Sequence, residues 1–288
     1  MNLSLYASLG FCLFYGLQIV LQSFFLRGSI HPVQMMFLTN FTSFLLLTLF
    51  HGVSNKKVFQ IRLQKPILSL FLLATALWII ADMSSMIGLT ISSSVNLSIL
   101  SRLQLFITYI GAVLFLGEGF SGKRILAILL AFVGSLLTVM HGQSIIFSVG
   151  DILFLIFTVA ISISGLLRQK IAGGMSVHQM TYFMYGISSL VTGIVMLFVA
   201  PLHSIPIPGF ILGNAFLALL GFTCVNYAIG KGGASQFSLV SSILPFITAL
   251  FSLLVLKEIP SMYQMVGGAV IVLSIFLFLD KPWKKKTA

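Results

Sequence analysis

Long apolar runs dominate the sequence and alternate with short polar connections. Each run is about 20 residues long, the length of helix that crosses about 30 Å of hydrocarbon. Glycine, proline and basic residues mark the connections between them. The pattern predicts ten membrane-spanning helices, at residues 3–25, 33–52, 67–88, 92–116, 123–140, 150–168, 178–200, 210–230, 234–256 and 261–280.

Two parts of the chain repeat each other at a separation of 140 residues. Residues 92–139 align without a gap with residues 232–279, and ten positions are identical. In both copies small polar residues lead into an apolar helix, an L-x-L-x-E turn and a second apolar helix. The repeat divides the chain into two five-helix halves, residues 1–141 and 142–288. Many membrane carriers are built from such repeats, with the substrate site between them.

The basic residues fall mostly on one side of the predicted membrane. With a cytoplasmic N-terminus, thirteen Lys and Arg residues, Arg168 among them, lie on the cytoplasmic side, and only Arg27 and Lys257 lie outside. This bias is typical of membrane proteins, and it places both termini in the cytoplasm. Because each half has an odd number of spans, the second half is inverted relative to the first. The predicted fold is therefore an all-α integral membrane protein made of two inverted-topology five-helix repeats.

The composition agrees with a multi-pass protein of the inner or plasma membrane. Hydrophobic residues make up 58% of the chain, charged residues 7%, and the mean hydropathy is +1.12, whereas soluble domains carry about 25% charged residues. The net charge of +11 lies in loops, helix ends and the tail. Such a distribution indicates membrane topology with lipid as the surroundings, and no nucleic-acid partner is expected.

The second copy of the repeat resembles a known family. Residues 238–273 read SLVSSILPFITALFSLLVLKEIPSMYQMVGGAVIVL. They hold a proline within the ninth span, a glutamate in the turn and two following glycines: Pro245, Glu258, Gly267 and Gly268. The first copy, residues 98–134, departs from this pattern with Arg102 and with Leu105 in place of the proline. The chain resembles the EamA-type members of the drug/metabolite transporter superfamily, which implies transport of a small metabolite and leaves the substrate open.

Asp82 and Arg102 are the acid and the base that the pattern places well inside spans. A charge at the centre of a membrane helix costs about 2.5–3.5 kcal/mol, so such residues are functional candidates. The planar guanidinium of Arg102 suits a carboxylate or phosphate, and Asp82 would orient Arg102 or meet a cationic group. The position equivalent to Arg102 in the other half is the uncharged Ser242. A buried Asp82–Arg102 pair that only locks two spans together remains the alternative.

Other polar and aromatic residues share helix faces with these two. The candidates for substrate binding are Gln18 and Gln22 in the first span, Asn40 in the second, Trp78 in the third, Tyr182 and Tyr185 in the seventh, and Ser238 and Ser242 in the ninth. Pro245 has no amide hydrogen, so it frees the carbonyl of Ser241. For each of these polar groups, packing between helices is an equally good explanation.

Several motifs carry no chemistry of their own. Residues 117–123 resemble a phosphate-binding loop, but Arg124 stands where a Ser or Thr would bind magnesium, and no strand precedes them. Glu118 and Glu258 follow spans and are interpreted as turn residues near the next helix N-terminus, with a gate latch as the alternative. The histidines lack metal-ligand spacing. The sequence predicts no metal, no cofactor and no enzyme activity.

The predicted function is secondary transport by alternating access through a cavity between the two halves. The substrate is expected to be a small metabolite, amino-acid-like and zwitterionic or anionic, with protons or a counter-substrate as further partners. One alternative is a proton-coupled exporter of lipophilic cations that depends on Asp82. The other is a non-transporting membrane receptor or scaffold. A monomer or weak homodimer is expected.

Overall fold

Helices form all the regular structure in the part of the chain that the structure describes. The structure is a computed structural model, and it describes residues 3–25, 31–54, 58, 65–92, 94–140, 148–199, 208–257 and 261–279. The first half of the chain contains α1 (Leu3–Phe25), α2 (Pro32–Ser54), α3 (Lys65–Ile91), α4 (Ser94–Leu100), the short 3₁₀ helix η2 (Ser101–Leu103), α5 (Gln104–Leu116) and α6 (Gly122–Met140). The second half contains α7 (Gly150–Ile171), α8 (Val177–Val199), α9 (Pro208–Gly232), α10 (Ala234–Ser241), α11 (Leu244–Leu256) and α12 (Met262–Leu279).

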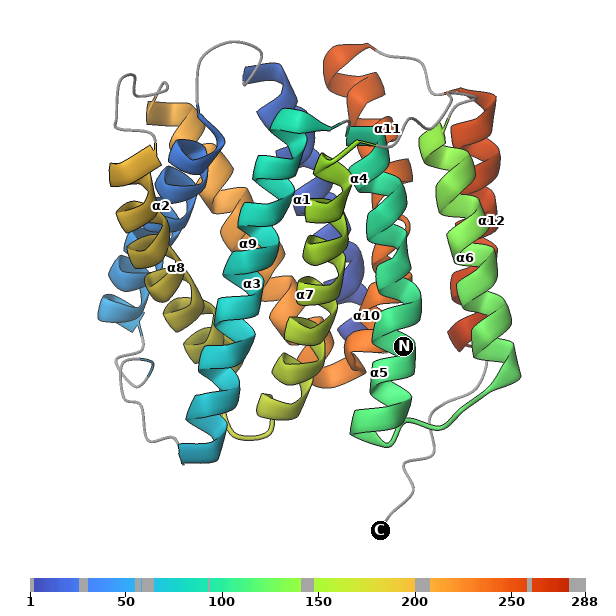
Figure 1. Cartoon of the computed structure of the whole chain (residues 1–288), viewed down its shortest axis with the longest axis horizontal. Helices are drawn as coiled ribbons and strands as arrows, with labels where there is room; N and C mark the ends of the chain where they lie inside the picture. Colours follow the sequence, from blue (N-terminus) through green and yellow to red (C-terminus); the bar gives the residue numbers. More distant parts are fainter. Residues whose placement is uncertain are drawn as a thin grey trace.

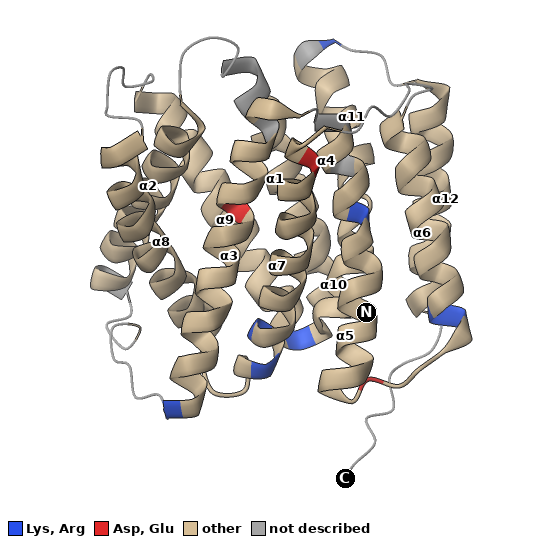
Figure 2. Ribbon diagram, in the orientation of Figure 1, with Lys and Arg blue, Asp and Glu red and all other residues tan. Residues whose placement is uncertain are grey.

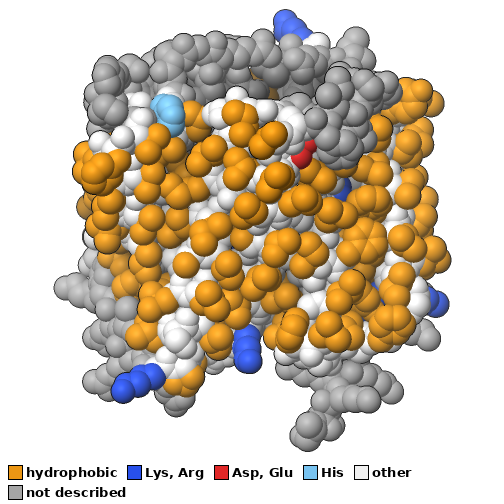
Figure 3. Space-filling model, viewed as in Figure 1, with side chains coloured by type: hydrophobic (Ala, Val, Ile, Leu, Met, Phe, Trp, Pro, Cys, Tyr) orange, Lys and Arg blue, Asp and Glu red, His pale blue; other side chains and the backbone are white. Residues whose placement is uncertain are grey.

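The outer surface of the bundle suits lipid. Among the described residues, nine helices are long and apolar enough to cross a membrane, and Ser101–Leu116 forms a shorter apolar helix. Hydrophobic side chains cover the flank of the bundle (Figure 3). Among the exposed apolar residues, Phe198 is 84% and Leu254 is 74% exposed. An apolar surface this extensive does not face water in a soluble monomer. The protein is a multi-pass membrane protein, and a tenth intact span stays a prediction.

Two of the predicted spans are interrupted at equivalent places. In the second half α10 ends at Ser241 and α11 begins at Leu244, with Pro245 in its first turn, as the missing proline amide predicts. The first half has no proline there, yet η2 separates α4 from α5. The hydroxyl of Thr158 in α7 donates a hydrogen bond to the carbonyl of Leu100 (3.2 Å). The same hydroxyl lies 2.8 Å from the Phe154 carbonyl of its own helix, so Thr158 places α7 against the interrupted segment.

Helices of the first half pack mainly on helices of the second. The most extensive contacts join α3 to α7, α1 to α9, α6 to α12 and α2 to α8. In Figure 1, α3 and α6 begin at the lower end of the view, whereas α7 and α12 begin at the upper end. The backbones of α6 and α12 meet at Gly134 and Gly267, where a Cβ on Gly267 would lie 2.5 Å from the Gly134 carbonyl oxygen.

Basic side chains gather at one end of the bundle. Figure 2 shows blue segments at the lower ends of α3, α6, α7 and α9, where the chain carries Lys65, Lys123, Arg124, Lys170 and Lys231. Among the described residues, Lys257 lies at the opposite end, after α11. The asymmetry agrees with the charge bias of the sequence.

Candidate functional site

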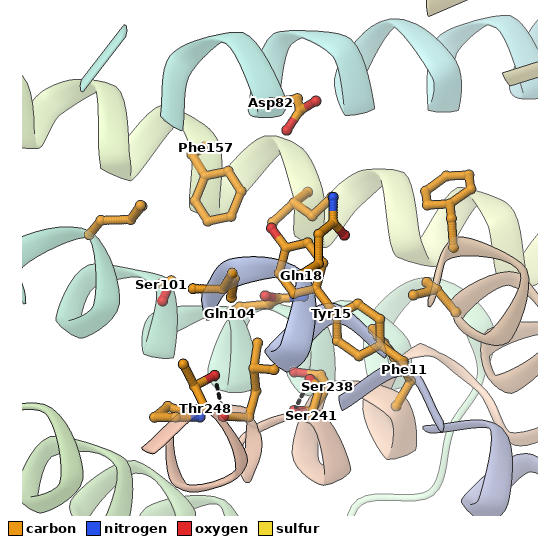
Figure 4. A pocket seen from close by; sticks show the side chains of 18 of the residues that line it. Phe11, Tyr15, Gln18, Asp82, Ser101, Gln104, Phe157, Ser238, Ser241 and Thr248 are labelled. Carbon is orange, nitrogen blue, oxygen red and sulfur yellow. Dashed lines mark hydrogen bonds between the residues drawn. The ribbon is translucent and has the colours of Figure 1, made fainter. Parts of the chain in front are cut away.

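A cavity of about 820 Å³ lies in the middle of the bundle, between helices of both halves. Its walls come from α1 to α6 and η2 of the first half, and from α7 to α12 of the second. Figure 4 shows Asp82 on one side, Ser238, Ser241 and Thr248 on the other, and Gln18 and Tyr15 between them. Seven predicted site residues line this cavity: Gln18, Asn40, Trp78, Asp82, Arg102, Tyr185 and Ser238.

Three further predicted site residues are placed differently. Tyr182 is buried against the ring of Phe44, with ring centroids 5.0 Å apart, and it lies outside the cavity lining. Ser242 also lies outside the lining and donates a hydrogen bond to the Leu239 carbonyl (2.6 Å). The side chain of Gln22 lies outside the described residues.

Asp82 and Arg102 lie at a similar level along α7. The Ser164 hydroxyl of α7 donates to the Ala74 carbonyl of α3 (2.8 Å). The two helices run in opposite directions (Figure 1). Asp82 follows Ala74 by eight residues, or about 12 Å of helix, which brings it opposite residue 156 of α7. Thr158 contacts Leu100, two residues before Arg102. An acid and a base therefore line one level of the cavity.

Polar side chains at this site have unused hydrogen-bonding groups. The Gln18 Oε1 and Ser238 Oγ atoms are buried and have no hydrogen-bond partner among the described residues. Asn40, in contrast, donates from Nδ2 to the Ser188 hydroxyl of α8 (2.9 Å). Buried polar atoms are nearly always hydrogen bonded, and an unpartnered one calls for an explanation. A polar ligand in the cavity would supply partners for both Gln18 and Ser238.

Arg168 is a second base in the cavity lining, and the sequence pattern did not single it out. The sequence pattern assigns Arg168 to the cytoplasmic-side charges, but its side chain is 2% exposed and lines the cavity. Its Nη1 donates to Asn226 Oδ1 (3.0 Å) and its Nε to the Ser164 carbonyl (3.4 Å). The guanidinium also lies over the ring of Phe222, 5.4 Å from its centroid. The burial of Arg168 is not evident from the sequence, because the residue stands near the end of a helix.

Three aromatic rings form one side of the cavity, here called the aromatic wall: Trp78, Tyr185 and Phe222. The centroid of Phe222 lies 4.5 Å from that of Trp78 and 5.3 Å from that of Tyr185. Trp78 precedes Asp82 by one helical turn, on the side of the cavity that leads toward Arg168. The wall therefore connects the level of Asp82 with that of Arg168.

Glu118 joins the two halves at the lower end of the bundle. Its carboxylate accepts hydrogen bonds from Ser235 Oγ of α10 (2.6 Å) and Gln169 Nε2 of α7 (3.3 Å). Arg124 Nη1 lies 3.9 Å from the same carboxylate. Gln169 also accepts from the Ala234 amide (2.7 Å). Glu118 stands in a turn that begins at the left-handed Gly117 (φ 66°), and it also holds the start of α10.

A bundle of apolar helices around an internal cavity that is lined partly by charged and polar side chains is typical of membrane transporters. The chain belongs to the EamA-like transporter family, part of the drug/metabolite transporter superfamily: the family model matches residues 2–140 and again residues 148–280. The family points to transport, and no comparison gives positive evidence of catalysis.

Relatives with names or solved structures agree with this assignment. The chain is 30% identical over 202 residues to "Uncharacterized transporter YyaM" of Bacillus subtilis (strain 168), a match that covers 66% of this chain and 65% of the relative. It is 41% identical over 64 residues to "Uncharacterized protein MJ1333.1" of Methanocaldococcus jannaschii, covering 22% of this chain and 47% of the relative. In both cases less than two thirds of the relative's length is matched.

One protein of known crystal structure has the same fold. Its backbone superposes with a TM-score of 0.81 over 96% of each chain, at 14% sequence identity. Identity this low supports the fold alone.

Proposed function

We propose that the protein is a secondary transporter that moves a small organic metabolite by alternating access through the central cavity. The observation that carries the proposal is the cavity of about 820 Å³ between the two halves, with Arg102 and Asp82 at one level. Arg102 would hold the anionic group of the substrate, and Asp82 and the Gln18 carbonyl would accept from its ammonium group. An amino-acid-like zwitterion fits this separation of donors and acceptors.

The two interrupted helices support this site. Arg102 lies in η2 between α4 and α5, and Ser238 lies in α10, one turn before the second break. Interrupted membrane helices line the substrate sites of many carriers, because their open backbone groups and helix ends can face a polar ligand. The proposed substrate would thus contact both halves and respond to their relative movement.

The topology proposed for this mechanism has ten spans in two inverted halves, residues 1–141 and 142–288, with both termini in the cytoplasm. Three observations support it: the two matches of the family model, the two breaks at equivalent places, and the basic residues gathered at one end of the bundle (Figure 2). On this topology the Glu118 contacts lie on the cytoplasmic side.

A second candidate is export of lipophilic cations coupled to protons. The aromatic wall favours it, because aromatic faces attract cations, and Asp82 would alternate between proton and drug. Arg102 and Arg168 oppose it, since two buried cations in the lining repel a third. The anionic or zwitterionic substrate is therefore the better-supported candidate.

A thermal-shift screen of the purified protein distinguishes the two. A ligand that binds the folded state raises its apparent stability according to its concentration and affinity. We expect amino acids and related zwitterions to raise the melting temperature of the wild type, and Arg102→Ala to lose this response. Stabilisation by lipophilic cations alone, retained in Arg102→Ala and lost in Asp82→Asn, would overturn the proposal.

A further inference from the structure

Arg168 has no acidic partner within the protein that the structure describes. The described acids are Asp82, Glu118 and Asp151. Glu118 contacts Ser235, Gln169 and Arg124. Asp151 contacts Asn96 and the Ser148 amide at the opposite end of α7. The recorded contacts of Arg168 are those to Asn226, to the Ser164 carbonyl and to the Phe222 ring, none of which is charged.

The neighbours of Arg168 hold it in place and leave part of its hydrogen-bonding capacity unused. Asn226 donates from Nδ2 to the Thr181 hydroxyl (3.0 Å), which directs its Oδ1 toward Arg168. A guanidinium has five N–H donors, and the two recorded hydrogen bonds use two of them. A buried charge without a counter-ion is unfavourable. Because Arg168 lines the cavity, an anion in the cavity can supply that counter-ion.

Arg168 is well separated from Arg102. It follows Thr158, which marks the level of Arg102, by ten residues of α7, or about 15 Å of helix. The aromatic wall lies between the two levels and reaches Arg168 through Phe222. The surroundings of Arg168 therefore combine a cation with flat apolar faces, while Arg102 donates a hydrogen bond to the hydroxyl of Ser101 (3.3 Å).

We infer that Arg168, Asn226 and the aromatic wall form a second anion subsite, which binds the carboxylate of an organic acid with a planar apolar body. The acid replaces the missing counter-ion of Arg168, and its planar body packs on Trp78 and Phe222. This inference rests on the proposed function in one respect, that the cavity is a substrate site. Arg102 and Arg168 then recognise acid groups at two different levels of the cavity.

The test measures binding of 3-phenylpropionate to the purified full-length protein by isothermal titration calorimetry. Its uncharged amide, 3-phenylpropionamide, and acetate serve as comparison probes. We expect 3-phenylpropionate to bind, and each comparison probe to bind at least 10-fold more weakly. Arg168→Gln should weaken 3-phenylpropionate binding by about 10- to 100-fold, the range for losing a hydrogen bond to a charged group. Lys170→Gln is the matched control, because it removes the same charge from an exposed position on the same helix, and it should bind as the wild type does.

A second variant covers the case in which Arg168→Gln does not fold. Asn226→Asp has the same shape and places a carboxylate against Arg168, so it should fold and yet lose 3-phenylpropionate binding. Arg102→Gln should retain it. Absence of binding to the wild type, or unchanged binding in Asn226→Asp, would overturn the inference. If only Arg102→Gln loses 3-phenylpropionate binding, the subsite at Arg168 is overturned and the proposed function stands. If Arg102→Gln binds amino acids as the wild type does, the proposed function is contradicted.

Discussion

Replacing Gly267 by alanine should loosen the contact between α6 and α12. A Cβ at this position would lie 2.5 Å from the Gly134 carbonyl oxygen and 2.8 Å from the Thr138 amide nitrogen, and it would also clash with the Thr138 hydroxyl. Ordinary contacts of a Cβ begin at 3.4 Å. Two of the three atoms belong to the backbone and cannot rotate away, so the helices must separate by roughly 1 Å, a gap that loses a quarter to a half of each dispersion contact.

The expected loss of stability is about 2–3 kcal/mol, the upper part of the range for overpacking. For a chain of this size that corresponds to a fall of about 4–12 °C in melting temperature, measured by tryptophan fluorescence of the detergent-purified protein. Gly213→Ala in α9 is the matched control, because its Cβ would meet nothing within 4 Å. It should melt at or slightly above the wild-type temperature, since alanine favours helix over glycine by up to about 1 kcal/mol.

Two outcomes would refute this reasoning. One is a Gly267→Ala protein that melts with the wild type, which would mean that α6 and α12 do not approach this closely. The other is an equal loss in Gly213→Ala, which would mean that any added methyl group in a helix is harmful. Adding Thr138→Ala to Gly267→Ala should restore little stability, because the two backbone contacts remain.

Three further changes test the site and its supports. Glu118→Ala should lower the melting temperature, because removing the carboxylate that Ser235 and Gln169 contact costs about 3 kcal/mol. Ser235→Ala should lower it less, since it removes only one of these hydrogen bonds. Equal losses in the two variants would contradict the hydrogen bonds assigned to Glu118. Asp82→Asn should weaken zwitterion binding and leave binding of simple carboxylates unchanged, as measured by calorimetry; loss of both would show a general structural defect. Ser238→Ala should weaken substrate binding about 5- to 10-fold without lowering the melting temperature, because its hydroxyl has no partner among the described residues; unchanged binding would remove Ser238 from the site.

The sequence predicts the fold well because membrane insertion leaves a strong local signal. Long apolar runs predict membrane-spanning helices, and Pro245 predicts an open carbonyl at Ser241, the residue at which α10 ends. The equivalent break at η2 could not be predicted, since no proline stands there. It coincides with a hydrogen bond from Thr158, which is 58 residues away in sequence.

The candidate site is predicted only in part, because the position of some residues depends on contacts with helices far away in sequence. Buried charges near the middle of a span, such as Asp82 and Arg102, are visible in sequence because they interrupt an apolar run. Arg168 stands near a helix end next to Lys170, where basic residues usually face the membrane surface. Its burial depends on Asn226 and Phe222 of α9. Likewise, helical spacing puts Tyr182 and Tyr185 on one face, but the contact of Tyr182 with Phe44 lies outside the cavity.

The central claim is that Arg102 holds the anionic group of a transported substrate. Counterflow in liposomes tests it most directly. Wild-type protein and Arg102→Ala are reconstituted in equal amounts into liposomes that contain an amino acid found in the thermal-shift screen. The radiolabelled form of the same amino acid is then added outside the liposomes. We predict accumulation of label by the wild type and none by Arg102→Ala, although both melt at similar temperatures. Normal counterflow by Arg102→Ala would contradict the account.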